Sequence, residues 1–88
     1  MRILVIEDEP KLGDYLKKGL EENGYVVDIA RDGIEGRYLA TEGDYGLILL
    51  DVMLPGIDGF AVLKAIRRTK NVPVLVLTAR DKVEDRVN

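Results

Sequence analysis

The apolar run Leu47-Ile48-Leu49-Leu50 is the feature of this sequence that most constrains its fold. Four consecutive aliphatic side chains without alternation predict a strand that is covered on both faces, as in a parallel sheet. The run stops at Asp51, which is therefore expected at the carboxyl end of that strand. Because open α/β sheets bind ligands at this edge, Asp51 is the first candidate for a reactive group.

Strand-like and helix-like segments alternate along the rest of the chain. Three further strands are expected at residues 2–6, 25–30 and 74–77. Helices are expected from Pro10 to the closing pair Asn23-Gly24, from about Ile34 to near Gly43, and from a cap at Asp58 to the break at residues 71–73. Residues 79–88 are expected to form a loop and the start of a fourth helix. The alternation predicts one α/β domain, with a parallel sheet and helices on both faces.

Two acidic residues, Glu7 and Asp8, directly follow the first strand and indicate the order of the strands. With the order 3-2-1-4, the ends of strands 1 and 3 would lie roughly 10 Å apart, whereas with 2-1-3-4 they would be neighbours at about 4.8 Å. Only the second order brings Glu7, Asp8 and Asp51 into one pocket. It also places Thr78, at the end of strand 4, beside Asp51. We therefore predict a sheet of order 2-1-3-4.

Three carboxylates at one sheet edge repel each other, and a bound cation would remove this repulsion. The chain contains neither His nor Cys, so the ligands of such a cation would be oxygen atoms only. Oxygen ligands in an open cleft suit Mg²⁺, which keeps several waters and binds phosphate oxygens. A carboxylate beside this ion can attack a phosphoryl group and become an aspartyl phosphate, which the hydroxyl of Thr78 could then sense.

The composition argues against several classes of function. A formal charge of −3 does not suit a segment that grips a nucleic-acid backbone, because such binding needs clustered Lys and Arg. No apolar run approaches the ~20 residues that span a bilayer, so no membrane partner is expected. The first residues lead straight into a strand without a signal peptide, and a cytoplasmic protein is the default expectation.

Three motifs, in register along nearly the whole chain, resemble the receiver domains of bacterial two-component response regulators. They are ILVIEDE at residues 3–9, LLDVMLPGIDG at 49–59 and PVLVLTA at 73–79. The resemblance implies a flavodoxin-like, doubly wound fold in which Asp51 is the phosphoacceptor and Thr78 is the switch hydroxyl. It also implies that Glu7, Asp8, Asp51 and the backbone carbonyl of Met53 hold Mg²⁺. Of the first two, Asp8 is the stronger candidate ligand.

The same resemblance implies partners for the chain. A sensor histidine kinase would supply the phosphoryl group, and the domain would be a phosphoacceptor rather than an enzyme, with self-catalysed phosphotransfer and dephosphorylation left open. In detail the sequence, including VEDRV at residues 83–87, is most similar to that of transcription factors with a winged-helix DNA-binding domain, heavy-metal-responsive members among them. DNA would then be bound only through an output domain outside these residues.

One part of the family pattern is missing. A full receiver domain continues to a fifth strand that ends in a lysine, whereas Lys64 and Lys70 flank the third helix here and Lys82 follows strand 4. We therefore expect residues 1–88 to be a receiver domain that is incomplete at its C-terminus, without the fifth strand and helix. Strand 4, which is apolar on both faces, would be a sheet edge, so self-association through this strand or by segment exchange is expected.

Two other classes of function stay open at this point. The missing lysine is consistent with a receiver-like interaction module that does not transfer phosphate. A nucleotide or flavin binder with the same strand order would need a Gly- or Ser/Thr-rich phosphate loop after strand 1. The acidic run Glu7-Asp8-Glu9 stands there instead and would repel phosphate without a metal, so this class ranks third.

Overall fold

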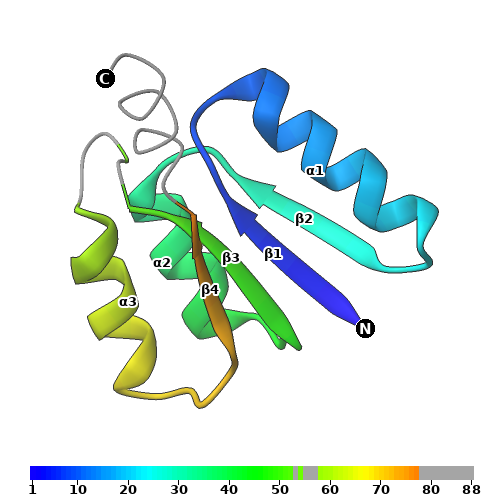
Figure 1. The fold of residues 1–88 in the computed structure, drawn as a ribbon. Helices are drawn as coiled ribbons and strands as arrows, with labels where there is room; N and C mark the ends of the chain where they lie inside the picture. The colour runs from blue at the N-terminus through cyan, green and yellow to red at the C-terminus, as the bar shows by residue number, and fades with distance from the viewer. Residues whose placement is uncertain (53, 55–57, 78–88) are drawn as a thin grey trace.

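A four-stranded parallel sheet forms the centre of the structure (Figure 1). The computed structural model describes residues 1–52, 54 and 58–77. The strands are β1 (Arg2–Ile6), β2 (Val26–Ala30), β3 (Leu47–Asp51) and β4 (Val74–Leu77). They lie in the order β2-β1-β3-β4, and each neighbouring pair is parallel. The predicted order 2-1-3-4 and the doubly wound α/β fold are therefore confirmed.

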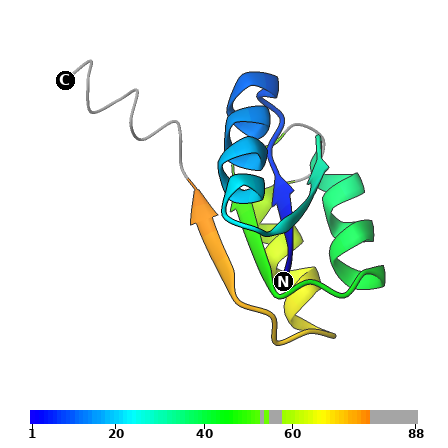
Figure 2. The same ribbon diagram turned by 90° about the vertical axis from the view of Figure 1, so that its right-hand side faces the viewer.

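In the described part of the chain, three helices cover the two faces of this sheet (Figures 1 and 2). They are α1 (Pro10–Glu22) on one face, and α2 (Gly33–Glu42) and α3 (Gly59–Arg67) on the other. The predicted cap at Asp58 is confirmed, because its side chain accepts a hydrogen bond from the Phe60 N–H at 2.9 Å. Such caps satisfy backbone donors that the first turn of a helix leaves without partners. Among the described residues, no helix is both long and apolar enough to cross a membrane.

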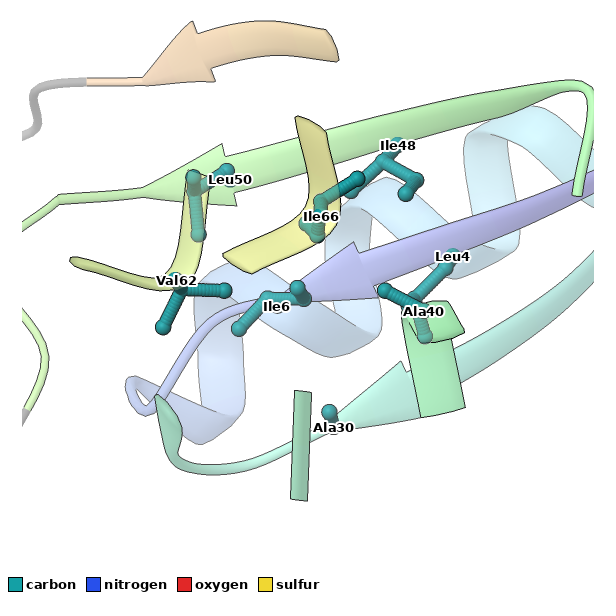
Figure 3. Close-up of a cluster of buried hydrophobic side chains, with 8 residues drawn as sticks. All are labelled: Leu4, Ile6, Ala30, Ala40, Ile48, Leu50, Val62 and Ile66. Atoms are coloured by element: carbon teal, nitrogen blue, oxygen red, sulfur yellow. The ribbon is translucent and has the colours of Figure 1, made fainter. Parts of the chain in front are cut away.

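The buried side chains form two clusters, one on each face of the sheet. The cluster under α2 and α3 (Figure 3) consists of Leu4, Ile6, Ala30, Ala40, Ile48, Leu50, Val62 and Ile66. The cluster under α1 consists of Ile3, Val5, Val27 and Leu49. Successive residues of β1 and β3 thus point to opposite faces, and both faces are buried, as the apolar runs without alternation predict.

The strand β4 lies at the edge of the described sheet, as expected. Its side chains are more exposed than those of β1 and β3: Leu75 is 56% exposed and Val76 is 38% exposed. In register, Leu75 lies beside Leu49 and Val76 lies beside Leu50. The apolar surface of the buried strand β3 therefore continues onto a strand that is only partly covered.

Two glycines let helices approach the sheet closely. A Cβ atom at Gly36 would lie 2.6 Å from Cγ2 of Ile6, and a Cβ atom at Gly59 would lie 2.2 Å from Cα of Val52. The Gly59 N–H also donates a hydrogen bond to the Val52 carbonyl at 3.3 Å. Gly59 therefore holds the start of α3 against the residue that directly follows Asp51.

Substitution of Gly59 by alanine is expected to destabilise the domain by about 1–3 kcal/mol, because the new methyl group meets backbone atoms that cannot move independently of β3. The measurement is the free energy of unfolding in urea. The matched control is Gly19→Ala on α1, since a Cβ atom at this position would have no neighbour within 4 Å. That change should stabilise the domain by roughly 0.5–1 kcal/mol. Equal effects of the two substitutions would contradict the close packing at Gly59.

Candidate functional site

Three carboxylates meet at the carboxyl edge of the sheet. Glu7 and Asp8 directly follow β1, and Asp51 is the last residue of β3. The two strands are neighbours, with Ile6 beside Leu50 in register. One oxygen from each of the three carboxylates lies within 4.8 Å of the others. The structure thus brings together the three acids that the sequence predicted would meet.

The three side chains differ strongly in burial. Glu7 is 1% exposed and Asp51 is 4% exposed, whereas Asp8 is exposed. One oxygen of Glu7, Oε2, accepts a hydrogen bond from the Glu9 N–H at 3.1 Å. The other oxygen, Oε1, is buried and has no hydrogen-bond partner in the described structure. A buried carboxylate oxygen without a partner is unfavourable unless a ligand or a proton satisfies it.

The surroundings of Glu7 disfavour its charged form. Burial is the main cause and raises the pKa of this carboxyl group from 4.5 to about 7. The hydrogen bond from the Glu9 N–H acts in the opposite direction, while the negative charges of Asp51 and Asp8 raise the pKa further. In the absence of a cation, Glu7 is therefore half protonated near neutral pH.

The donor set fits a hard divalent cation. All three side chains offer carboxylate oxygens, and one of these oxygens is buried without a partner. A cation would satisfy that oxygen and compensate the repulsion between the charges. Magnesium and calcium prefer oxygen ligands of this kind. The acidic cluster could therefore hold a metal ion.

Two of the predicted site residues, Met53 and Thr78, lie outside the described residues, so their predicted roles stay predictions. Of the lysines noted above, Lys64 and Lys70 are among the described residues. The side chain of Lys70 is hydrogen-bonded at a distance from the acidic cluster. Its ammonium group donates a hydrogen bond to the Gly43 carbonyl at 3.0 Å, at the end of α2.

The sequence analysis missed two features of the site. The burial and the raised pKa of Glu7 were not predicted, while the ranking of Asp8 as the stronger candidate ligand stays a prediction. The signal was present in the alternation along β1, because Glu7 is in phase with Ile3 and Val5, which point to the α1 face. It also missed Gly59, whose role depends on the close approach of α3 to Val52.

Comparison with known proteins gives consistent results. A family model described as the response regulator receiver domain matches residues 3–88. The transcriptional activator protein IrlR of Burkholderia pseudomallei is 58% identical over 87 residues, which cover 99% of this chain and 38% of IrlR. The chain thus spans about two fifths of the length of this relative.

Two solved structures of the response regulator TrrA from Thermotoga maritima are also similar, each with 42% sequence identity. One is TrrA in complex with Mg(2+)-BeF, with a TM-score of 0.84 over 89% of this chain and 69% of TrrA. The other is TrrA in complex with the histidine kinase ThkA, with a TM-score of 0.82 over 89% of this chain and 68% of TrrA.

The Glu7→Gln variant is expected to remove a pH dependence of stability from the metal-free protein. The folded state raises the pKa of Glu7 from 4.5 to about 7, so it binds the proton more tightly than the unfolded state. Stability contributed by the wild-type residue therefore falls as the pH rises from 4.5 to 7, and stays low above that range. At pH 8, the variant should be more stable than wild type by roughly 3 kcal/mol.

Urea unfolding with a chelator present, at pH 8 and near pH 4, measures this difference, which should vanish at the lower pH. The control is Glu22→Gln, which removes an exposed carboxylate from the end of α1. A pH dependence of Glu7→Gln that matches wild type would contradict the assignment of the shifted group to Glu7.

Proposed function

Because this chain belongs to the response regulator receiver domain family, we propose that it accepts a phosphoryl group on Asp51. The observation that carries the proposal is the buried carboxylate of Asp51 beside those of Glu7 and Asp8, at the ligand-binding edge of the sheet. In the reaction, a bond forms between phosphorus and a carboxylate oxygen of Asp51, and the bond between phosphorus and the donor breaks. The proposed donor is a sensor histidine kinase, which the complex of the relative TrrA with ThkA supports.

The proposed metal ion is Mg²⁺, held by Glu7, Asp8, Asp51 and the backbone carbonyl of Met53. The fit of the oxygen-only donor set supports this choice, as does the description of TrrA with Mg(2+)-BeF. When bound, the ion supplies neutralisation of charge on the transferred group. The residues of this chain would supply the rest: Asp51 provides the attacking oxygen, and the neighbouring carboxylates of Glu7 and Asp8 complete the set of oxygen ligands for the ion. Thr78 is the proposed switch hydroxyl.

The proposed output is regulation of transcription through a DNA-binding domain outside these residues, in the cytoplasm. The relative IrlR, a transcriptional activator that is longer than this chain, supports this part of the proposal. On this view residues 1–88 are the receiver part of such a regulator and act as a phosphoacceptor rather than as an enzyme.

Incubation with a magnesium salt and a small phosphodonor is expected to add one phosphoryl group to the wild-type chain, because the nucleophile and the acidic cluster are both in place. Intact mass spectrometry measures the adduct. Asp51→Asn should abolish it, since the neutral amide oxygen is not a nucleophile as the carboxylate oxygen is. A chelator should abolish it as well.

The matched control for this experiment is Asp44→Asn, which changes an exposed aspartate just before β3 and should leave the adduct unchanged. An adduct that persists in Asp51→Asn would overturn the assignment of the phosphoacceptor. If the wild type forms no adduct, the alternative function is favoured, a receiver-like interaction module without phosphotransfer.

We also propose that the 88-residue chain associates with itself through β4 or by segment exchange. The support is the position of β4 at the edge of the described sheet, with Leu75 56% exposed and Val76 38% exposed. An edge strand presents unpaired backbone groups, and exposed apolar side chains beside it favour pairing with another chain.

Sedimentation of the 88-residue chain is expected to show a dimer whose fraction rises with protein concentration. Leu75→Lys should shift the distribution toward the monomer, because a charge on an edge strand opposes pairing. Val26→Lys is the control on the opposite edge strand β2, where the side chain is 52% exposed. A monomer at all concentrations would refute this proposal and leave phosphoacceptance untouched.

A further inference from the structure

Two large apolar side chains of the helix α2, those of Ile34 and Tyr38, are exposed, whereas Leu39 packs partly against the core. The buried residues of α2 are Gly33, Gly36 and Ala40, all of them small. Ile34 is 62% exposed and Tyr38 is 64% exposed. These two are four residues apart and therefore share one face of the helix. The packing of this domain leaves most of their apolar surface in contact with solvent.

Between α2 and α3 lies a groove of about 190 Å³. The groove is lined by Arg37 of α2 and by Ala61, Lys64, Ala65 and Arg68 of α3 and its C-cap. The residues from α3 follow helical spacing and form one stripe, in which small and basic side chains alternate. The alanine side chains are short, so another chain can approach the backbone of α3 closely between the basic side chains.

The three cations of this groove have no carboxylate partner in the described part of the chain, where the ion pairs are Arg2 with Asp28 and Arg31 with Asp14. By contrast, the next basic side chain of α3 is engaged within the fold. Arg67 donates to the Val72 carbonyl at 2.6 Å and closes the loop before β4. The basic side chains of the groove are therefore available to bind a ligand, whereas Arg67 is already hydrogen-bonded within the fold.

The helix dipole explains only part of this arrangement. Lys64 and Arg68 lie near the C-terminus of α3, where positive charge is favourable. Arg37 comes from the middle of α2, where no such effect acts. Three cations thus gather at one groove in a chain whose net charge is −3, and Arg37 lies one helical turn from the exposed Ile34.

We propose that the groove between α2 and α3 is a docking site for an acidic amphipathic helix of another protein. Carboxylates of that helix would lie between Arg37, Lys64 and Arg68, and its apolar residues would cover Ile34 and Tyr38. Helix-in-groove binding of this kind uses apolar anchors at helical spacing with flanking charge complementarity. The proposal concerns a different surface from the carboxylate cluster and does not rest on phosphotransfer.

Two other occupants fit the surface less well. An anionic membrane would gain only about 1 kcal/mol from each cation near its surface, and the net negative charge of the chain opposes such binding. A second copy of this chain would have to offer an acidic helix. The exposed helix α1 does not qualify, because it mixes both signs of charge: Lys11, Lys17 and Lys18 with Asp14, Glu21 and Glu22.

The test uses a synthetic helical peptide of about 15 residues in which Glu and Leu repeat at helical spacing. Titrated into the isotope-labelled 88-residue chain, it should shift backbone amide resonances of α2 and α3, and high salt should weaken the binding. The double variant Lys64→Glu with Arg68→Glu should weaken binding by about tenfold or more. Both side chains are exposed, and an unchanged circular dichroism spectrum checks that the variant folds.

The control Lys18→Glu reverses an exposed charge on α1 and should leave the affinity within about twofold of wild type. The proposal is overturned if the peptide does not bind, if its shifts fall outside α2 and α3, or if the double variant binds it equally well. Two probes separate the other ligand classes. Stronger binding to phosphatidylserine vesicles than to the peptide, or equal shifts with inorganic phosphate, would also overturn the proposal in favour of a membrane or simple anion site.

Discussion

The parallel pairing of β1 with β3 is the constraint on which the rest of the structure depends. It places Ile6 beside Leu50, so the residues that follow the two strands arrive at the same point of the sheet edge. Both strands are buried on both faces, and each large aliphatic side chain that they bury contributes about 1.5–3 kcal/mol. This apolar burial outweighs the repulsion between Glu7, Asp8 and Asp51. The core therefore holds together three charges that would separate if they were free.

Much of the fold could be predicted from the sequence because its local signals agree with one another. Apolar runs without alternation predicted buried parallel strands, and a capping aspartate at position 58 predicted the start of α3. The strand order was predicted indirectly, from the requirement that the acids meet. That inference succeeded because the carboxyl ends of parallel strands lie at the same edge of the sheet. Residues far apart in sequence therefore become neighbours once the strand order is known.

The features that could not be predicted depend on distances across the fold. Nothing local to Gly59 shows that a Cβ atom there would meet Val52, because the clash arises only when α3 packs on the sheet. Helical periodicity also gives no warning that α2 turns Ile34 and Tyr38 outward. At Gly36 the helix lies so close to Ile6 that a small residue is required there, while Ile34 and Tyr38 are exposed. In both cases a glycine sets the distance between a helix and the sheet, and this distance limits the size of the side chains that fit between them.

Two carboxylates in this sheet show how environment separates a structural role from a functional one. Asp28 of β2 accepts hydrogen bonds from the Tyr45 hydroxyl at 2.8 Å and from Arg2 at 2.9 Å. The hydrogen bond from Tyr45 is the main cause that lowers the pKa of Asp28, and burial raises the pKa of Tyr45 to about 12. The charge of Asp28 is thus satisfied within the fold, and no further ligand is needed.

Glu7 is more deeply buried, but the fold satisfies only one of its oxygens and sets the charges of Asp51 and Asp8 nearby. A fold selected only for stability would have no reason to keep this arrangement, since an apolar side chain at position 7 would avoid the desolvation and the repulsion. The carboxylate is therefore best explained by what it binds. The fold that satisfies Asp28 internally leaves Glu7 dependent on a proton or a cation from outside.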